Sequence, residues 1–198
     1  MIPVYVVTGL LGSGKTTLIN LELRERKKLG STEIISFETG NAEFIKSPLS
    51  IEPDDIEENL SHVVQQIQDY ISTTTPKEIW VEWNGMFSFQ QLERIFFNSI
   101  LKEFCHLERV IYTAKNTNIT SMIQALGDRI VSQLYSADYI MLYASDTTQT
   151  KAVKKLLQSY NPECSLLVNP TEKDIHNRLS QPIWPWSLYG IVAILTLY

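Results

Sequence analysis

The feature that most constrains this chain is a glycine-rich stretch close to its N-terminus. Residues 9–17 read GLLGSGKTT and match the phosphate-binding pattern G-x-x-x-x-G-K-[ST] at every fixed position. Residues 2–7 before it are apolar and β-branched, which predicts a buried strand, and residues 17–25 after it predict a helix. This order of elements favours a working phosphate loop over a glycine-rich turn with an incidental lysine.

The residue types in this loop suit a polyphosphate ligand. Glycines allow backbone N–H groups to turn inward, and the following helix points its positive dipole end at the same place. Lys15 adds a charge for the β and γ oxygens, and Thr16 offers a hydroxyl to Mg²⁺. The loop residues predicted to bind the nucleotide are Gly9, Gly12, Ser13, Gly14, Lys15, Thr16 and Thr17.

Composition narrows the class of protein. A chain of 198 residues is long enough for one sizeable α/β domain with a short appendage. The net charge of -5 argues against a nucleic-acid-binding surface, so the basic residues at 24–28 are expected to be a solvated helix end. The two cysteines, Cys105 and Cys164, have no metal-ligand spacing, and no secretory leader is expected; both points favour the cytoplasm.

Strand-like and helix-like segments alternate along the rest of the chain. This alternation predicts an α/β protein with the three-layer P-loop NTPase fold and a mostly parallel central sheet. Residues 47–53 are expected to be a polar, proline-marked connection. The further predicted strands are 33–37, 109–114, 138–144 and 165–168, and residues 78–85 are predicted to be the third strand and the loop beyond it. The further predicted helices cover 54–71, 90–97, 119–134 with a break at Gly127, and 150–160.

Acidic residues at predicted strand ends are candidates for metal and water chemistry. Glu82 ends the third strand, where a Walker-B carboxylate holds Mg²⁺ or orients the attacking water; an ordinary strand-end acid is the alternative. Glu38 and Glu43 lie in a loop at the carboxyl end of the second strand, where ligand groups gather. Either could face the metal or a water, or the loop could simply be solvated. Gly85 lies where a backbone N–H could meet a γ-phosphate.

Taken in order, these motifs resemble the CobW-like P-loop GTPases, which are related to the metallochaperone GTPases of nickel and cobalamin enzymes. Residues 6–20 are close to that family's opening. Residues 37–40, FETG, resemble its Asn-Glu-x-Gly switch loop, with Phe37 replacing the asparagine. Residues 81–85 resemble its Glu-x-x-Gly Walker-B segment.

The resemblance continues through the second half of the chain. Gln133, followed by residues 137–142, resembles the lead-in to the family's guanine-specificity strand. Asn161 and Pro162 fit the pair that precedes its last core strand. The resemblance covers residues 1–170, which are predicted to be the P-loop GTPase-like domain, and it implies GTP or ATP with Mg²⁺ as cofactors.

Two departures from the family pattern bear on function. The family's Cys-x-Cys-Cys motif should fall between the switch loop and the helix at Asp55, and no cysteine occurs there, so metal transfer through thiolates is not supported. The guanine motif Asn-Lys-x-Asp is represented by residues 143–146, YASD. Asp146 could still accept from guanine N1 and N2, and Tyr143 could stack on either purine, which leaves GTP against ATP open.

Residues 171–198 are treated as an apolar C-terminal tail, with no charged side chain beyond Arg178. Three alternatives are open for it. A membrane-spanning helix needs about 20 apolar residues, and the tryptophans would suit an interface belt. The run could instead be a final buried strand, or the chain could stop early, since the family that it resembles has a further C-terminal domain.

Two hypotheses about function follow. In the first, a slow cytoplasmic GTPase acts as a switch on a protein partner, either a metalloprotein or a transporter, with membrane association open through the tail. Lys15 and Mg²⁺ would neutralise developing charge, and Glu82 or Glu38 would orient water. The second is a nucleotide-binding regulatory module that hydrolyses little or nothing. A kinase-like phosphotransferase is less favoured because the sequence shows no acceptor-site motif.

Overall fold

The apolar runs of the sequence pair into one sheet in the computed structural model, which describes residues 1–25, 31–38 and 43–181. Among the described residues the sheet has seven strands in the order β3-β2-β4-β1-β5-β6-β7, and all neighbouring strands in it are parallel. This confirms the predicted α/β class. The strands are β1 (Ile2–Gly9), β2 (Thr32–Ser36), β3 (Leu49–Ser50), β4 (Glu78–Glu82), β5 (Cys105–Lys115), β6 (Tyr139–Tyr143) and β7 (Ser165–Val168).

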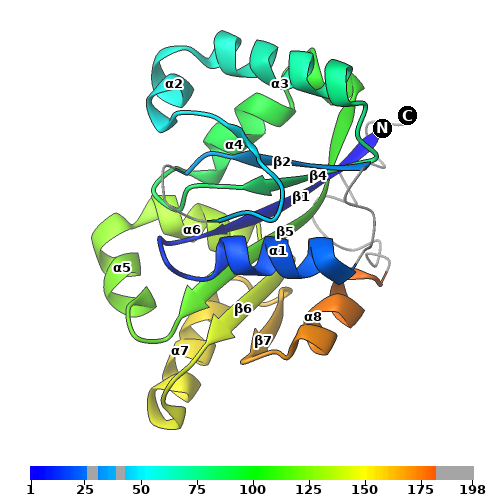
Figure 1. Ribbon diagram of the computed structural model, residues 1–198. Helices are drawn as coiled ribbons and strands as arrows, with labels where there is room; N and C mark the ends of the chain where they lie inside the picture. Colours follow the sequence, from blue (N-terminus) through cyan, green and yellow to red (C-terminus); the bar gives the residue numbers. More distant parts are fainter. Residues whose placement is uncertain (26–30, 39–42, 182–198) are drawn as a thin grey trace.

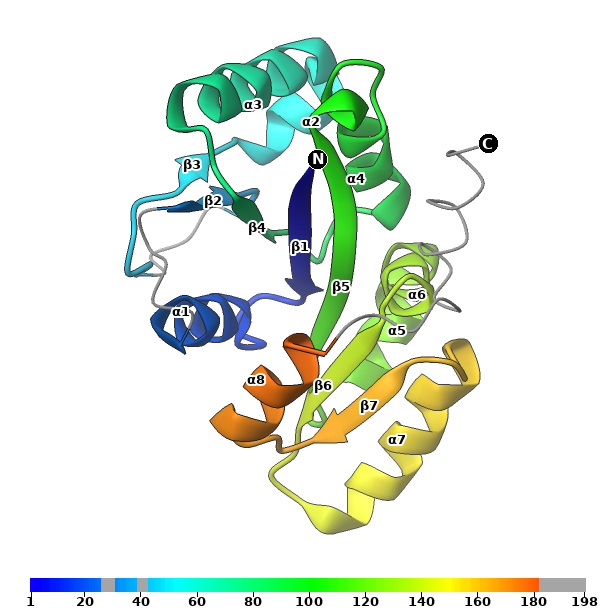
Figure 2. The ribbon, with the colours of Figure 1, turned by 90° about the vertical axis from the view of Figure 1, so that its right-hand side faces the viewer.

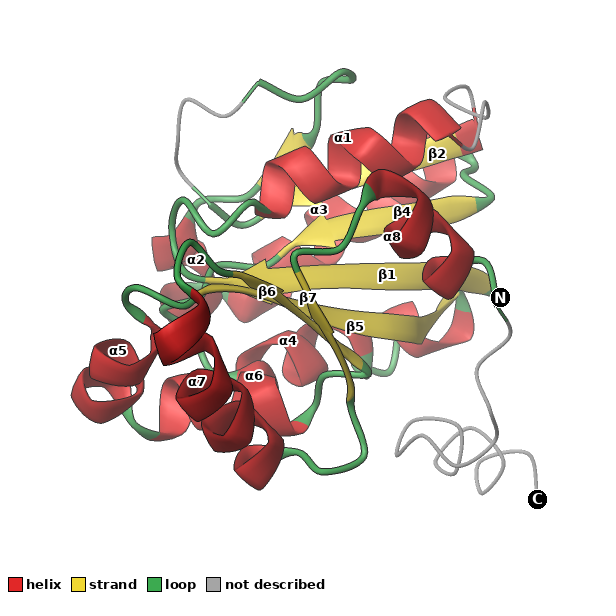
Figure 3. Cartoon of the chain, turned by 90° about the horizontal axis from the view of Figure 1, so that it is seen from below, coloured by secondary structure: helices red, strands yellow, loops and turns green. Residues whose placement is uncertain are grey.

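Helices cover both faces of the sheet and give the chain three layers (Figures 1 and 3). One core cluster joins α1 and α8 to one face, and a larger one fills the opposite face. The helices are α1 (Lys15–Glu25), α2 (Pro53–Glu58), α3 (Leu60–Thr74), α4 (Phe89–Phe96), η2 (Leu101–Glu103), α5 (Ile119–Leu126), α6 (Asp128–Tyr135), α7 (Thr147–Tyr160) and α8 (Glu172–Leu179).

The strand order places the phosphate loop at the centre of the sheet. β1 lies between β4 and β5, and the chain crosses over β4 on its way from β1 to β2 (Figure 2). In the register, Val7 pairs with Glu82, and Ser36 also pairs with Glu82. The carboxyl ends of β1, β2 and β4 therefore meet at one edge, which is where ligands bind in open α/β sheets.

Two elements differ from the sequence predictions between β2 and β4. Residues 47–53 were expected to be a connection, yet Leu49 and Ser50 add a short parallel edge strand next to β2. The helix expected over 54–71 is broken at Asn59, whose backbone leaves the helical region (φ -145, ψ 60) and whose side chain caps α3 by accepting from His62 N. The apolar spacing continues across this break and therefore conceals it.

Helix α8 lies within the segment that the sequence analysis assigned to the apolar tail. A capping box starts it: Thr171 and Asp174 each accept a hydrogen bond from the other's backbone N–H. Ile175 and Leu179 are buried in the core cluster that also contains α1. The alternatives raised for the remainder of the tail concern residues 182–198, which lie outside the described residues. No helix within residues 1–25, 31–38 and 43–181 has the length and apolarity needed to cross a bilayer.

A buried arginine connects α8 to the amino-terminal edge of the sheet. Arg109 of β5 donates to the carbonyl oxygens of Arg178, at 3.2 Å, and of Gln181. It also donates to the Tyr139 hydroxyl at 2.9 Å. Next to it, Asp138 accepts a 2.8 Å hydrogen bond from the Val110 amide. Burial raises the pKa of Asp138 to about 6, although the Val110 amide and the Arg109 charge lower it.

This shift predicts a pH dependence of stability. The folded chain holds the Asp138 proton more tightly than the unfolded chain between pH 3.8 and about 6. Stability contributed by this group is therefore present at low pH and is lost as pH rises through that window. Relative to Asp138→Asn, which can still accept from Val110, we expect the wild type to lose about 2 kcal/mol in unfolding free energy from pH 4 to pH 7. Urea unfolding at several pH values measures this, and parallel curves for the two proteins would contradict it.

Candidate functional site

The phosphate loop folds as its glycines predict. Gly9, Gly12 and Gly14 all have positive φ, at 135°, 70° and 102°. At Gly9 the glycine is also a steric necessity, because a Cβ there would lie 2.2 Å from the Thr113 carbonyl oxygen. The turn is closed by a 3.1 Å hydrogen bond from the Ser13 amide to the Leu10 carbonyl. The loop backbone therefore packs directly against the end of β5, and only glycine allows that approach.

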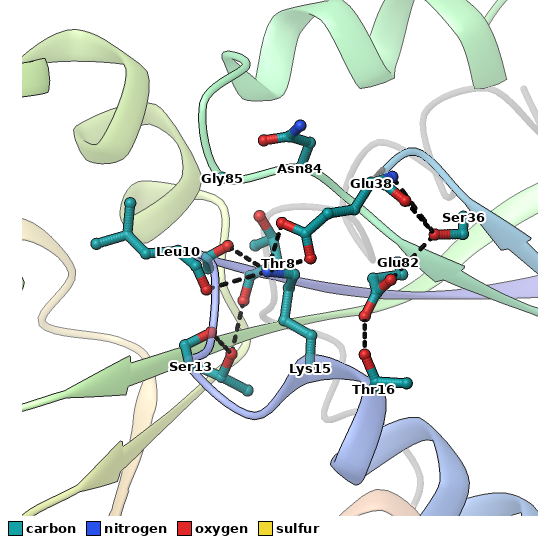
Figure 4. A network of polar contacts seen from close by, with 12 residues as sticks. Thr8, Leu10, Ser13, Lys15, Thr16, Ser36, Glu38, Glu82, Asn84 and Gly85 are labelled. Carbon is teal, nitrogen blue, oxygen red and sulfur yellow. Dashed lines mark hydrogen bonds and ion pairs between the residues drawn. The ribbon is translucent and has the colours of Figure 1, made fainter. Parts of the chain in front are cut away.

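Lys15 projects from the first turn of α1 into the centre of this loop. Its ammonium donates to the carbonyl oxygens of Gly9 at 2.8 Å and Leu10 at 3.0 Å (Figure 4). It also forms an ion pair with Glu38 at 3.0 Å, in which the lysine side chain is 2% exposed and the glutamate 12%. Of the two acids considered for this loop, Glu38 thus reaches the centre of the site, whereas Glu43 is exposed.

Glu82, at the end of β4, lies beside this ion pair. One carboxylate oxygen accepts from the Thr16 hydroxyl at 2.5 Å, and the other accepts from the Ser36 hydroxyl at 3.0 Å. Burial raises the pKa of Glu82, while the Thr16 hydrogen bond, the Lys15 charge and the Ser36 hydrogen bond lower it. The carboxylate and hydroxyl predicted to serve a metal are therefore adjacent in the fold.

A hydrogen bond between two hydroxyls attaches the phosphate loop to β5. Ser13 Oγ and Thr113 Oγ1 are 2.7 Å apart, and both residues are buried. Thr113 Oγ1 also donates to the Thr8 carbonyl at 3.2 Å. Ser13 thus holds the loop to β5, and its side chain points toward the sheet (Figure 4).

The turn that follows β4 presses against the phosphate loop. We call residues 84–87 the Gly85 turn; it is closed by a 3.1 Å hydrogen bond from the Phe87 amide to the Asn84 carbonyl. A Cβ on Gly85 would lie 2.3 Å from the Gly9 carbonyl oxygen and 2.9 Å from the Leu10 amide nitrogen. The backbones of the two loops are therefore in direct contact, which requires glycine at position 85.

An open cavity of about 360 Å³ lies above these groups, within the size range of small-ligand sites. Asn20 forms part of its far wall, where its amide donates to the Glu43 carbonyl and accepts from the Ile45 amide. The residues that line the cavity include the predicted lysine, both threonines next to it and three glutamates. Its lining is Leu11, Gly12, Gly14, Lys15, Thr16, Thr17, Asn20, Glu38, Glu43, Phe44 and Glu82.

The loop that carries Asp146 is held by two asparagines that the sequence analysis did not identify. Asn116, buried at the end of β5, donates to the Asp146 carbonyl at 3.3 Å and accepts from the Ser145 amide at 3.4 Å. Asn169, at the end of β7, exchanges hydrogen bonds of 2.7 and 2.9 Å with the backbone of Ala144. Asp146 itself is exposed.

Tyr143, the first residue of that loop, lies beside the phosphate loop. A Cβ on Gly14 would be 3.6 Å from its ring. Tyr143 therefore flanks the phosphate loop on the β6 side, whereas Glu38 and Glu82 flank it on the β2 and β4 side.

The structure brings most of the predicted site residues to one place. In the described part of the cavity wall are Gly12, Gly14, Lys15, Thr16, Thr17, Glu38 and Glu82, while Gly9, Ser13 and Gly85 form the backbone layer beneath it. Asp146 lies outside this lining, in the loop that follows β6. Residues 39–42 of the predicted switch loop, including Gly40, are outside the described residues. Ser36, Thr113, Asn20, Asn116 and Asn169 were missed, because none belongs to a local motif.

Comparisons with known proteins support this arrangement. A family model described as CobW/HypB/UreG, nucleotide-binding domain, matches residues 3–167. No curated protein matches the chain. The solved structure of the Zn(II)-bound YjiA GTPase from E. coli is similar, with a TM-score of 0.60 and 18% identity over 96% of this chain and 61% of that one. The chain thus spans 61% of the YjiA structure.

Two further structures share the fold. Hydrogenase maturation factor HypB from Archaeoglobus fulgidus has a TM-score of 0.53 and 11% identity, over 90% of this chain and 88% of that one. The signal recognition particle receptor FtsY from Elizabethkingia anophelis has a TM-score of 0.53 and 13% identity, over 88% of this chain and 61% of that one. At these identities the structures show a common fold.

The parallel sheet and the glycine loop with its buried lysine define a P-loop nucleotide-binding domain. The chain belongs to the CobW/HypB/UreG family, and the matched residues are the nucleotide-binding domain of that family.

The contact between the two loops predicts the effect of one added methyl group. Gly85→Ala should lower the unfolding free energy by about 2 kcal/mol, because its Cβ must displace the Gly9 backbone. Met86→Ala is the matched control, since Met86 lies in the same turn with 46% of its surface exposed, and it should cost no more than about 0.5 kcal/mol. Chemical unfolding of both variants checks this; equal small losses would show that the loops separate freely.

Proposed function

We propose that the chain binds GTP in this cavity and hydrolyses it slowly in the presence of Mg²⁺. The observation that carries the proposal is the buried Lys15 ammonium, held by two loop carbonyls and one carboxylate at the floor of the cavity. A buried cation in this setting binds phosphate oxygens strongly. The inward-facing loop backbone and the N-terminus of α1 add donors for the same anion.

Binding requires an exchange of partners at Lys15. A triphosphate and the Glu38 carboxylate compete for one ammonium, so the phosphates take the place of Glu38. Because two like charges cannot share this small space at low cost, Glu38 turns away as the nucleotide enters. The conformation of the loop after β2, at Glu38, would thus differ between the nucleotide-free and the nucleotide-bound protein.

The residues at the mouth of the cavity fit Mg²⁺. Thr16 and Glu82 present a hydroxyl and a carboxylate 2.5 Å apart, and hard oxygen donors of this kind are what the ion prefers. Thr16 and Glu82 would hold it, and when bound it would supply positive charge against the negative charge that builds up on the phosphates. Among residues 1–25, 31–38 and 43–181, no cluster of three or more His, Cys, Asp or Glu side chains offers another metal site.

Hydrolysis needs a water positioned at the γ-phosphorus. The water oxygen forms a bond to that phosphorus, the bond to the bridging oxygen breaks, and GDP and phosphate leave with the water protons shared among the products. Glu38, once released from Lys15, and Glu82, whose pKa is raised by burial, are the carboxylates that could orient this water. Lys15 neutralises charge on the phosphates throughout.

The partner is proposed to be a protein that handles a metal, either a metalloprotein or a transporter. The similar HypB structure is that of a hydrogenase maturation factor, which supports a role on a protein partner. Metal transfer through a Cys-x-Cys-Cys motif is not part of the proposal, since the sequence has two cysteines and Cys105 is buried. We place this activity in the cytoplasm.

Removing the ammonium tests the proposal directly. Lys15→Ala should weaken GTP binding by about 100-fold, because hydrogen bonds to a charged group contribute roughly 3 kcal/mol. Mg²⁺-dependent phosphate release should fall to background. Lys151→Ala, on the exposed face of α7, is the control and should match the wild type. Calorimetry and a phosphate-release assay measure both quantities.

The outcomes of this test separate the hypotheses. If the wild type binds no nucleoside triphosphate, the proposal fails. If it binds tightly but releases phosphate no faster than Lys15→Ala, the chain is a nucleotide-binding regulatory module.

The base preference is tested at Asp146. If this carboxylate accepts from guanine N1 and N2, Asp146→Asn should lower GTP affinity by about 10- to 100-fold, since such a paired contact contributes roughly 1–3 kcal/mol. XTP, whose base carries a carbonyl in place of the amino group, should gain affinity for the variant. Competition of GTP, XTP and ATP, with and without Mg²⁺, measures this. Equal displacement by GTP and ATP in the wild type would show that Asp146 does not read the base.

A further inference from the structure

A buried glutamine on α6 links the start of the phosphate loop to the Gly85 turn. Gln133 has no exposed surface, and its amide makes three hydrogen bonds. Its oxygen accepts from the Thr8 hydroxyl at 2.5 Å, immediately before the phosphate loop. Its nitrogen donates to the carbonyls of Gly85 at 3.1 Å and Phe87 at 2.5 Å, in the Gly85 turn. One side chain thus fixes both loops relative to the same helix.

The neighbouring residue of α6 extends this attachment. Ser132 accepts a 3.1 Å hydrogen bond from the Phe89 amide at the start of α4. The segment from 85 to 89 is therefore held by α6 on one side, while Gly85 rests on the Gly9 backbone on the other. It cannot move relative to the phosphate loop without stretching or breaking the Gln133 contacts.

A second buried amide in the same helix region shows what a purely structural role looks like. Asn161 donates to the carbonyls of Leu134 and Ala137, at 3.0 and 2.8 Å, and accepts from the Cys164 amide at 3.0 Å. These bonds close the C-terminal end of α6 and the chain leading to β7. Its partners do not border the phosphate loop, whereas each of the three partners of Gln133 belongs to a segment that does.

We infer that Gln133 is a positioning residue that sets the spacing between the phosphate loop and the Gly85 turn, and thereby sets how strongly the site distinguishes a triphosphate from a diphosphate. The inference rests on the proposed function. Only a triphosphate carries a γ-phosphate, and the sequence predicts that a backbone N–H at Gly85 meets it. Since hydrogen bonds weaken steeply with distance and angle, a turn released from Gln133 loses this contact while the α- and β-phosphate contacts of the loop remain.

The test is Gln133→Met, which keeps the length and flexibility of the side chain and removes its polar ends. The probes are GDP and guanosine 5′-(β,γ-imido)triphosphate, each titrated calorimetrically with Mg²⁺. The affinity ratio of triphosphate over diphosphate should fall about tenfold, the equivalent of losing one well-formed hydrogen bond to a charged group. GDP affinity should change by less than about twofold, because its contacts lie in the phosphate loop.

Two further variants keep the test decisive. Asn161→Leu removes a buried amide that closes the C-terminal end of α6 without contacting the phosphate loop or the Gly85 turn, so it should lower thermal stability without changing the ratio. Thr8→Val breaks the same link from the β1 side; it should lower the ratio in the wild type and add little in the Gln133→Met background, as coupled residues do.

Three results would overturn the inference. An unchanged ratio in Gln133→Met or in Thr8→Val would show that Gln133 is a packing residue only. An equal fall in Asn161→Leu would show that loss of stability alone moves the ratio. If the wild type binds neither probe, the proposed function fails as well, so the two failures are distinguishable.

Discussion

The site depends on one buried positive charge. The Lys15 side chain is 2% exposed, so its ammonium has exchanged water for protein partners almost completely. An ion in that position is costly unless acceptors surround it. The chain supplies them in two ways: the glycine loop turns the carbonyls of Gly9 and Leu10 toward it, and β2 ends where Glu38 can reach it.

The Lys15 charge also acts on the second carboxylate of the site, Glu82, by lowering its pKa. Burial raises the pKa of Glu82 and the Glu38 charge raises it too, while Thr16, Lys15 and Ser36 lower it. Under the proposed function, a nucleotide that displaces Glu38 brings its own negative charge next to Glu82. The need for a divalent cation between them follows from this, since two anions in a half-enclosed cavity repel each other strongly. Under the proposed function, nucleotide binding and metal binding are thus coupled by the charges of the phosphates and Glu82, and not by the shape of the phosphate loop alone.

The sequence predicted the elements whose patterns are local and missed those that depend on distant partners. The strand, loop and helix around Lys15 are all readable, because apolar runs and glycines report directly on backbone geometry. The break at Asn59 was missed since Ile56, Leu60 and Val63 keep a helical spacing across it. Helix α8 was missed because the long apolar run after it is the stronger sequence signal, although the Thr171–Asp174 capping box marks the start of the helix. The edge strand at Leu49 exists only because β2 lies next to it.

The roles of buried side-chain amides are the features of the site that are hardest to predict from the sequence. Asn116 and Asn169 are unremarkable polar residues in their own segments, and Gln133 was noted only as part of the lead-in to a strand, with no role of its own. Each nevertheless holds the backbone of a loop at the carboxyl edge of the sheet through hydrogen bonds on both ends of its amide. Because Asn116 and Asn169 support the backbone of the divergent motif at 143–146, this loop keeps its shape without the asparagine and lysine of the family pattern, and substitution there changes what the loop can contact more than where it lies.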